Sequence, residues 1–342
     1  MSDQDGGAIS PERIMMIGTG FFASKVTLSA VSMGLFTTLE AAGGADLAAI
    51  RRAHNLHERS ARDFLDCLVA LGLLLRDDAG IYSNAPESAV FLDRNKPSYV
   101  GGLLEMANAR LYGFWADLDE ALVTGKPQSE LKHGGSFFGN LYSDPVKLKT
   151  FLSAMTGLSA GTAQAMAKKF PWADYKSVID IGAAQGAMPA TLALAHEHLE
   201  VGGFDLPAVA PVFADYLTSL GLGERVKFHA GDFFADGLPS ADVLIMGHIL
   251  HDWSLDEKRM LLDKAYAALP EGGALIVYEA LIDDDRRQNV FGLVMSLNML
   301  IETDDGFDYS GADCQGWMKD AGFRKTRVEN LVGPEGMVVG IK

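Results

Sequence analysis

The sequence predicts an α/β protein with two domains, a helical N-terminal domain and a C-terminal domain built on a mostly parallel sheet. Three observations lead to this fold class. Up to residue 170 the apolar side chains recur at helical spacing, interrupted by one short hairpin. After Lys176 short apolar runs alternate with helical stretches, as expected when helices cover both faces of a parallel sheet. The last two strands are separated by only a few residues, which favours an antiparallel pair.

The N-terminal domain should occupy residues 11–170, after a disordered lead-in at residues 1–10. It opens with an apolar helix at 14–39, whose stripe of large side chains must be buried against something. Two short helices and a small hairpin follow, which together form a winged-helix pattern. The expected elements are helices at 46–55, 58–72, 98–124 and 143–169, the last starting at Ser143-Asp144-Pro145, and a hairpin within 73–83.

The C-terminal domain should occupy residues 171–342 and contain the sheet. Ser254 and Glu257 have the spacing of a capping box, which marks the start of one of its helices. The expected strands lie near 177–182, 201–205, 226–230, 241–248, 273–281, 325–331 and 337–342, and the expected helices near 187–198, 208–221 and 255–269.

Composition excludes several classes of protein. Lys and Arg number 29 against 45 Asp and Glu, and the net charge of −16 opposes binding to nucleic acid or to an anionic membrane. Four arginines between residues 51 and 62 could read DNA, but interleaved acids favour a solvated face. Cys67 and Cys314 are too few for a disulfide scaffold or a cysteine-built zinc site. No apolar run approaches the roughly 20 residues of a membrane span, and the polar, acidic N-terminus does not resemble a signal peptide, so we expect a cytoplasmic protein.

Three successive strand ends carry residues suited to a nucleoside. Segment 180–186 places an acid at the end of a strand and glycines in the turn that follows, where a ligand can approach the backbone. Asp205 ends the next strand and can accept hydrogen bonds from ribose hydroxyls. Gly231-Asp232-Phe233 ends the third strand and offers an acid and an aromatic face. The spacing matches neither the dinucleotide fingerprint nor a P-loop, which favours a nucleoside cofactor without a pyrophosphate.

In this order, the motifs resemble those of the class I S-adenosylmethionine-dependent O-methyltransferases. The sequence is most similar to the dimeric small-molecule group that includes caffeate, flavonoid, acetylserotonin and bacterial natural-product O-methyltransferases. The resemblance extends from about Pro11 to Lys342. The segments that carry it are 180–186, Phe204–Pro207, Gly231–Phe234, His248–Trp253, Leu269–Gly273 and Ala321–Phe323.

The resemblance implies a Rossmann-like methyltransferase domain preceded by a winged-helix-like dimerisation domain. It implies S-adenosyl-L-methionine as cofactor, S-adenosyl-L-homocysteine as product, a homodimer and a small-molecule acceptor. His251 would be the general base, with Glu279 and Asp308 as the carboxylates that orient it. The implied cofactor contacts are Asp180, Gly182, Gly186, Asp205, Leu206, Asp232 and Phe233. The implied lining of the acceptor pocket is Phe151, Met155, His248, Trp253 and Met295.

The sequence departs from the family pattern at two places. Ala183 and Ala184 stand where many members have glycines in the cofactor loop. Gly247 stands where some relatives have a basic side chain near the cofactor. Methyl groups in the loop would narrow the approach of the cofactor without having to block it.

The chemistry of methyl transfer to a phenol agrees with these residues. A neutral histidine can take the phenolic proton, and an acid on its far ring nitrogen fixes the tautomer. We expect no metal, although His248 and His251 are three residues apart and could supply half of a metal site. The leading hypothesis is an O-methyltransferase that acts on a small aromatic metabolite. Two alternatives stay open: a C- or N-methyltransferase of the same fold, for example on an aromatic keto acid and with or without a metal, and a non-catalytic cofactor-binding or regulatory protein.

Overall fold

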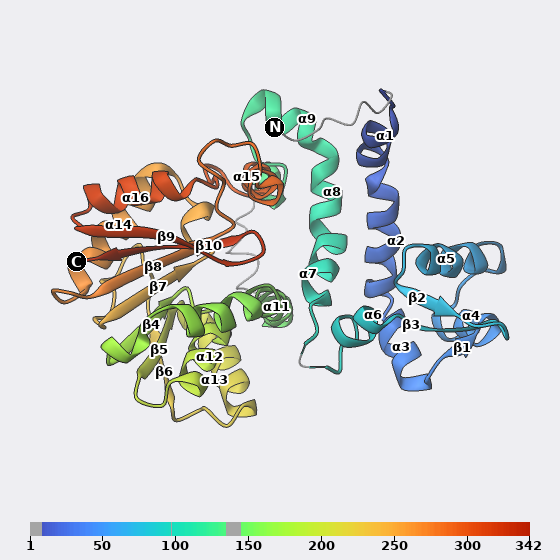
Figure 1. The fold of residues 1–342 in the computed structure, drawn as a ribbon, viewed down its shortest axis with the longest axis horizontal. Helices are drawn as coiled ribbons and strands as arrows, with labels where there is room; N and C mark the ends of the chain where they lie inside the picture. The colour runs from blue at the N-terminus through green and yellow to red at the C-terminus, as the bar shows by residue number, and fades with distance from the viewer. Residues whose placement is uncertain (1–8, 97, 135–144) are drawn as a thin grey trace, which may run out of the picture. The chain divides into compact units, whose positions relative to one another are not determined.

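The computed structural model describes residues 9–96, 98–134 and 145–342, so most of the expected lead-in and the start signal at 143–144 lie outside the described residues (Figure 1). The chain separates into two compact units, Met1–Leu111 and Tyr112–Lys342. This division differs from the boundary expected near residue 170. The long helix α11 (Pro145–Lys169) shares a core with the sheet, because its Leu152 and Met166 are buried in the same cluster as the strands.

The N-terminal unit has the predicted winged-helix pattern. Its hairpin strands β2 (Leu74–Arg76) and β3 (Ile81–Asn84) pair in antiparallel register, and an unpredicted two-residue strand, β1 (Ala45–Asp46), adds to β3 to complete a three-stranded sheet. The elements are α1 (Glu12–Gly18), α2 (Gly20–Ser32), α3 (Leu35–Ala42), β1 (Ala45–Asp46), α4 (Leu47–His54), α5 (Glu58–Ala70), β2 (Leu74–Arg76), β3 (Ile81–Asn84), α6 (Pro86–Phe91), α7 (Gly101–Met106) and a π-helical turn, Ala107–Leu111.

The single helix expected at 14–39 is three helices in the structure. Gly34 adopts a left-handed conformation, with φ 71°, that ends α2 and starts α3, and Thr19 separates α1 from α2. Together α1 and α2 form a helical segment, Glu12–Ser32, of 21 residues, long and apolar enough by length and composition to cross a membrane. The expectation that no segment reaches this length was therefore wrong. Only 17% of its most apolar 18-residue window is buried, and the large apolar side chains that the segment exposes are Ile14, Met15, Met16, Ile17, Phe21 and Phe22.

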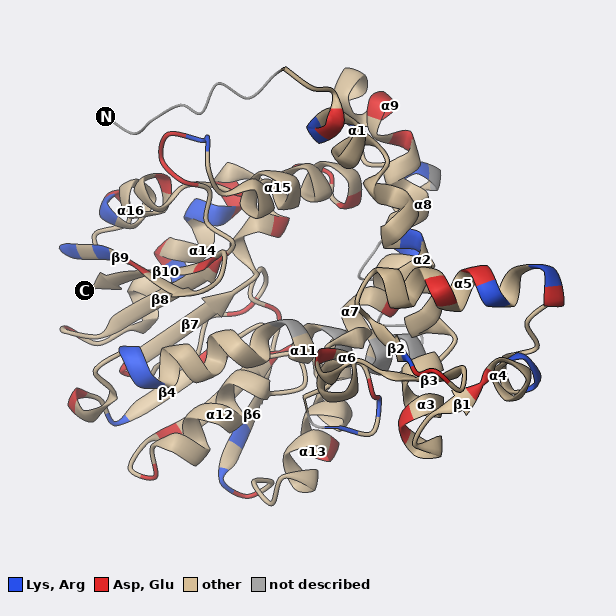
Figure 2. Ribbon diagram, turned by 45° about the vertical axis from the view of Figure 1, so that its right-hand side comes forward, with Lys and Arg blue, Asp and Glu red and all other residues tan. Residues whose placement is uncertain are grey.

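The two helices that could have formed a DNA-reading face carry arginines on both and acids on α5. Figure 2 shows acidic and basic positions alternating on α5. Arg51 on α4 lies 3.7 Å from Glu58 on α5, so part of the basic charge is paired within the unit. This arrangement agrees with a solvated face.

The C-terminal unit contains a seven-stranded sheet in the order β6-β5-β4-β7-β8-β10-β9. The first five strands are parallel, and β10 pairs antiparallel with both β8 and β9, as the short link between the last two strands predicted. The strands are β4 (Ser177–Ile181), β5 (Glu200–Asp205), β6 (Val226–Ala230), β7 (Val243–Gly247), β8 (Ala274–Glu279), β9 (Lys325–Val332) and β10 (Glu335–Ile341).

Helices cover both faces of this sheet, and each face has its own apolar core (Figure 1). One core packs α11, α12 and α13 against the strands, and the other packs α14 and α16. All six residues of β8 are buried, as expected for a central strand covered on both sides. The helices are α8 (Tyr112–Phe114), α9 (Leu118–Thr124), α11, α12 (Ala187–Ala195), α13 (Ala210–Ser219), α14 (Leu255–Ala268), α15 (Val290–Glu302) and α16 (Gly311–Asp320); the short 3-10 turns are Trp115–Asp117, Glu130–His133, Trp172–Asp174, Pro207–Val209 and Leu250–Asp252.

Candidate active site

The predicted cofactor motifs meet at one edge of the C-terminal sheet. The chain order of the strands reverses between β4 and β7, and ligands of open α/β sheets bind at such a switch point. The Gly182 N–H donates a hydrogen bond to the Phe204 carbonyl at 2.8 Å, and the Gly231 N–H donates to the Asp205 carbonyl at 3.0 Å. Hydrogen bonds therefore join the ends of β4, β5 and β6.

The loop after β4 requires glycine at both of its predicted positions. Gly182 and Gly186 have φ of 76° and 94°, in the left-handed region that side chains disfavour. A Cβ on Gly182 would lie 2.2 Å from Cδ1 of Ile249, which follows β7. The cofactor loop is thus in direct contact with the segment that carries the histidines.

The two alanines of this loop are accommodated in different ways. Ala184 has φ 50°, a conformation that costs roughly 1–2 kcal/mol for a residue with a Cβ. Ala183 is buried, and its Cβ lies 2.7 Å from where a Cβ on Gly203 would be, so glycine on β5 makes room for the methyl group. Gly247, which stands where some relatives have a basic side chain, also has no room for one. A Cβ on Gly247 would lie 1.9 Å from the ring of Tyr278, which occupies that space.

The Asp205 carboxylate lies at the centre of the strand ends. It accepts hydrogen bonds from the N–H of Ala184 at 2.9 Å and of Leu206 at 2.7 Å. Burial raises the pKa of Asp205 to about 6, although these two N–H donors lower it. A carboxylate has about four acceptor positions, so it retains the capacity to accept ribose hydroxyls. Asp180, inside β4, is buried, and burial and the Asp205 charge raise its pKa well above its usual value.

The third strand end supplies the expected acid and aromatic ring. Asp232 accepts a hydrogen bond from the Phe234 N–H at 2.8 Å, which fixes the turn after β6. Phe233 is half-buried and meets Trp253 edge to face, with ring centroids 5.9 Å apart. The donors, acceptors and apolar surface present at these strand ends fit the nucleoside part of S-adenosylmethionine.

His251 lies in the short turn Leu250–Asp252 that follows β7, and only 6% of it is exposed. Its Nδ1 lies 3.2 Å from Oδ1 of Asp308 and 3.5 Å from Oε2 of Glu279. Its backbone N–H donates to Oε1 of Glu279 at 3.4 Å. Glu279 ends β8, so the adjacent strands β7 and β8 bring the histidine and its carboxylate together.

Further hydrogen bonds hold the Glu279 carboxylate and the backbone of Asp308. The hydroxyl of Tyr309 donates to Oε1 of Glu279 at 3.2 Å, and the Asp308 N–H donates to Oγ of Ser296 on α15 at 3.3 Å. Glu279 and Asp308 are 1% and 2% exposed. The structure therefore brings the three predicted catalytic side chains together in one buried cluster.

This cluster controls the protonation of His251. Burial by itself lowers the pKa of His251, but the charges of Glu279, Asp252 and Asp308 outweigh it and raise the pKa well above 6.5. Burial raises the pKa of Glu279, although His251 opposes the shift. The carboxylates thus favour the protonated form of the imidazole, which can act as a base once that proton is released.

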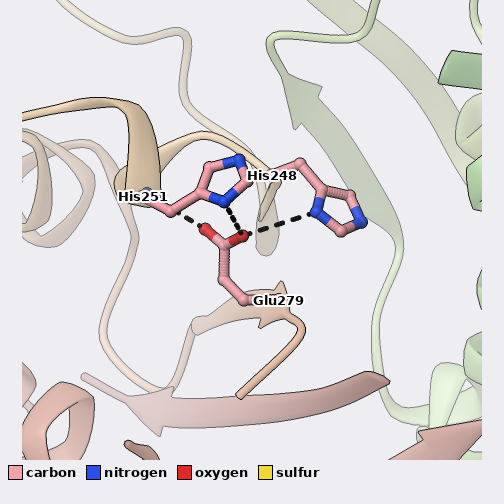
Figure 3. Close-up of side chains that lie close together, drawn as sticks. All are labelled: His248, His251 and Glu279. Carbon is pink, nitrogen blue, oxygen red and sulfur yellow. Dashed lines mark hydrogen bonds and ion pairs between the residues drawn. The ribbon is translucent and has the colours of Figure 1, made fainter. Parts of the chain in front are cut away.

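His248 is a second, partly buried histidine of the same cluster (Figure 3). Its Nδ1 lies 3.5 Å from Oε2 of Glu279, and its Nε2 lies 3.5 Å from Oε2 of Glu335. Burial, together with the His251 charge, lowers the pKa of His248 to about 3, so it is neutral. Ligand atoms of His248, His251 and Glu279 lie within 4.8 Å of one another, a spacing that a metal ion could also use.

Two family models match the chain. An O-methyltransferase domain matches residues 115–324, and an O-methyltransferase dimerisation domain matches residues 15–94. The chain belongs to the O-methyltransferase family. The fold and enzyme class implied by the sequence motifs are therefore confirmed.

Named relatives align with this O-methyltransferase along almost its whole length. It is 42% identical to the tetracenomycin polyketide synthesis 8-O-methyl transferase TcmO of Streptomyces glaucescens over 97% of each chain. It is 36% identical to the N,N-dimethyltransferase OxyT of Streptomyces rimosus over 96% of each chain. Human N-acetylserotonin methyltransferase, solved in complex with S-adenosylmethionine, has a TM-score of 0.90 and 26% identity, covering 100% of this chain and 99% of that one.

The residues expected to line the acceptor pocket lie on several elements of the O-methyltransferase. Phe151 and Met155 are half-buried on α11, and Met295 is half-buried on α15, next to the Ser296 that holds Asp308. Trp253 packs against Phe233 and Phe234, with its centroid 4.6 Å from that of Phe234. It therefore belongs to the aromatic group beside the predicted adenine contacts, and its place in the acceptor pocket stays a prediction.

Several members of the cluster in this O-methyltransferase were not predicted. Tyr309 and Glu335 reach it from the segment before α16 and from the start of β10, and no local motif marks either residue. Lys258 on α14 is fully buried beside the cluster, although a lysine in an amphipathic helix normally faces solvent. Asp252 could have been found in the sequence, because it directly follows His251. Its Oδ1 lies 3.7 Å from Nε2 of His251.

Proposed function

We propose that this protein methylates a hydroxyl group of a small aromatic, natural-product-like metabolite, with His251 as general base oriented by Glu279 and Asp308. The observation that carries the proposal is the contact between the cofactor loop at Gly182 and Ile249. Because Ile249 is two residues from the buried His251, this contact supports a base close to the cofactor loop.

The cofactor is S-adenosyl-L-methionine, which supplies an electrophilic methyl group on a positively charged sulfur and leaves as S-adenosyl-L-homocysteine. Gly182, Gly186 and the Leu206 backbone would line its path, Asp205 would accept its ribose hydroxyls, and Asp232 and Phe233 would hold its adenine. Asp180, buried at the end of β4, would complete the cofactor site beside Asp205. No metal is required for this assignment.

Residues of this chain would remove the proton from the hydroxyl group of the acceptor. A phenol has a pKa near 10 and is a poor nucleophile until its proton is removed. Nδ1 of His251 faces Glu279 and Asp308, so Nε2 is the atom that would accept this proton. The carboxylates would fix the ring and stabilise the imidazolium that forms, as in other acid–histidine pairs.

The names of the relatives support the choice of acceptor. TcmO is named as an 8-O-methyl transferase of polyketide synthesis, so an aromatic polyketide with a free hydroxyl is the acceptor class that we propose. OxyT is named as an N,N-dimethyltransferase, which makes an aromatic amine the first alternative. The close ligand atoms of His248, His251 and Glu279 make a metal-assisted C-methylation the second.

A transfer assay separates these acceptors. The protein is incubated with methyl-labelled S-adenosylmethionine and, separately, with polycyclic phenols, aromatic amines and aromatic keto acids. We expect label on a phenolic oxygen, at the same rate before and after dialysis against EDTA. Label on nitrogen or carbon would replace the proposal by the corresponding alternative. Activity that is lost in EDTA and returns with a divalent ion would assign the histidine cluster to a metal.

We also propose that the exposed apolar surface of α1 and α2 forms the interface of a cytoplasmic homodimer. Phe21 and Phe22 are 53% and 62% exposed, and their rings lie 4.3 Å apart. A matched dimerisation domain includes both residues. Large exposed apolar patches of this kind mark interfaces.

The change Phe22→Glu should convert the dimer to a monomer, because it places a charge in the apolar interface. Light scattering coupled to size-exclusion chromatography in detergent-free buffer measures the mass. Leu194→Glu, at an apolar residue of α12 that is 63% exposed, is the matched control and should remain dimeric. A wild-type protein that is monomeric, or that requires detergent, would contradict the proposed interface.

A further inference from the structure

A buried ammonium group lies beside the segments that carry His251 and Asp308. Lys258 on α14 is 0% exposed. Burial lowers the pKa of Lys258 to about 8, although Glu279, Asp308 and Asp252 partly offset this. Burying an ammonium group is costly, and an apolar side chain of the same length would fill the space without that cost. Packing alone therefore does not explain why a lysine stands here.

The contacts of Lys258 connect the two segments. Nζ donates a hydrogen bond to the carbonyl of Trp253, two residues after His251. The same nitrogen lies 3.5 Å from the ring centroid of Phe307 and 5.7 Å from that of Tyr309. Phe307 and Tyr309 flank Asp308, so one cation contacts both the histidine turn and the segment with the orienting carboxylate.

These segments are also in close contact with each other. A Cβ on Gly306 would lie 2.6 Å from the carbonyl oxygen of His251. Two residues further on, Asp308 reaches Nδ1 of His251 at 3.2 Å. A small displacement of residues 306–309 would therefore break the interaction between the carboxylate and the ring.

We infer that Lys258 is a positioning residue for the methyl transfer: it holds the Gly306–Tyr309 segment against the His251 turn, and its positive charge balances the carboxylates around the base. The inference rests on the proposed function of His251. The charged and titratable groups around Lys258 and His251 are Asp252 on the His251 turn, Glu257 on α14, Glu279 on β8, His248 after β7, Glu302 on α15, Asp308 and Tyr309 before α16, and Glu335 on β10.

The sign of the electrostatic effect follows from the charges. Without the ammonium, the surroundings of His251 become more negative, and the imidazole holds its proton more tightly. The pH at which the base becomes available therefore rises. A lysine that only filled space would leave this pH unchanged.

The test compares Lys258→Met, which has a similar length and no charge, with Lys319→Met on the exposed face of α16. For Lys258→Met we expect kcat to fall about 10–100-fold, with the affinity for S-adenosylmethionine within about twofold of wild type. The acidic limb of the kcat–pH profile should move up by about 0.5–1 pH unit. Lys258→Arg should restore the position of the limb, and Lys319→Met should match wild type in every measurement.

Other results would overturn the inference. A kcat loss in Lys258→Met with an unmoved acidic limb would show a structural role only, and an unchanged kcat would show no role. If Lys258→Met does not fold, Phe307→Leu keeps the lysine and removes the ring beneath its ammonium; unchanged kcat in that variant also overturns the inference. His251→Ala separates the two proposals. Activity in His251→Ala would refute the role of His251 as base. An inactive His251→Ala together with wild-type behaviour of Lys258→Met would refute only the positioning role of Lys258.

Discussion

Replacing His251 with alanine should lower kcat by about 10²–10⁴-fold, the usual contribution of general acid–base catalysis. The cofactor site should be unaffected, because Asp205 and the Gly182 loop interact with other residues. Single-turnover rates and calorimetric titration with S-adenosylmethionine measure the two effects separately. Added imidazole should restore part of the activity if the lost function is proton acceptance. Turnover near the wild-type rate would remove His251 from the mechanism.

The pH dependence of the same reaction tests how the base is held. The carboxylates raise the pKa of His251 above its ordinary value, so the rate should rise as pH increases through that raised pKa. In Asp308→Asn one of these charges is lost, so the acidic limb should move to lower pH. At the same time kcat should fall. A neutral amide at position 308 interacts more weakly with the imidazole than the carboxylate does, whose Oδ1 lies 3.2 Å from Nδ1 of His251. A limb that moves to higher pH would contradict this electrostatic account.

The parts of the fold that the sequence predicted are those set by local patterns. Each strand of the large sheet is a short run with apolar residues and lies within a few residues of its predicted position. The capping box of Ser254 and Glu257 is present and starts α14 where predicted. The antiparallel pairing of β9 and β10 also followed from the short link.

The errors arise where tertiary contacts decide. The division after residue 111 differs from the boundary expected near residue 170, because α11, helical by its own pattern, shares a core with the sheet. Helices α15 and α16 were not predicted, although Ser310 and Asp313 form a capping box that could have revealed the second. The apolar segment Glu12–Ser32 was underestimated because scattered polar residues interrupt it in the sequence.

The candidate site likewise contains residues that local motifs predicted and residues that only tertiary contacts bring into it. His251, Glu279 and Asp308 were predicted from motif positions, and the structure brings them together. Lys258 and Glu335 could not be found by motif, because each reaches the cluster only through packing of α14 and of β10. Side chains that act through long-range contacts leave no local signal in one sequence.

Replacing Asp205 with asparagine should weaken binding of S-adenosylmethionine by about 100-fold. Hydrogen bonds to a charged group contribute about 1.5–3 kcal/mol each, and the loss of roughly 3 kcal/mol corresponds to that factor. The amide oxygen can still accept one backbone N–H, whereas the amide nitrogen cannot accept the second from Ala184 or Leu206. Calorimetric titration measures the Kd, and thermal unfolding without cofactor reports whether the loop itself is disturbed.

The pH dependence of cofactor binding distinguishes a direct contact from a disturbed loop. Burial raises the pKa of Asp205 to about 6, so the wild-type carboxylate loses its charge, and with it acceptor capacity, as pH falls below that value. Affinity for the cofactor should therefore decrease between about pH 7 and pH 5 in wild type. Asp205→Asn should lack this decrease, because it has no proton to gain. Asp215→Asn on α13 removes an equal charge from an exposed position and should keep both the wild-type Kd and its pH dependence. A pH dependence that persists in Asp205→Asn would mean that another group holds the ribose.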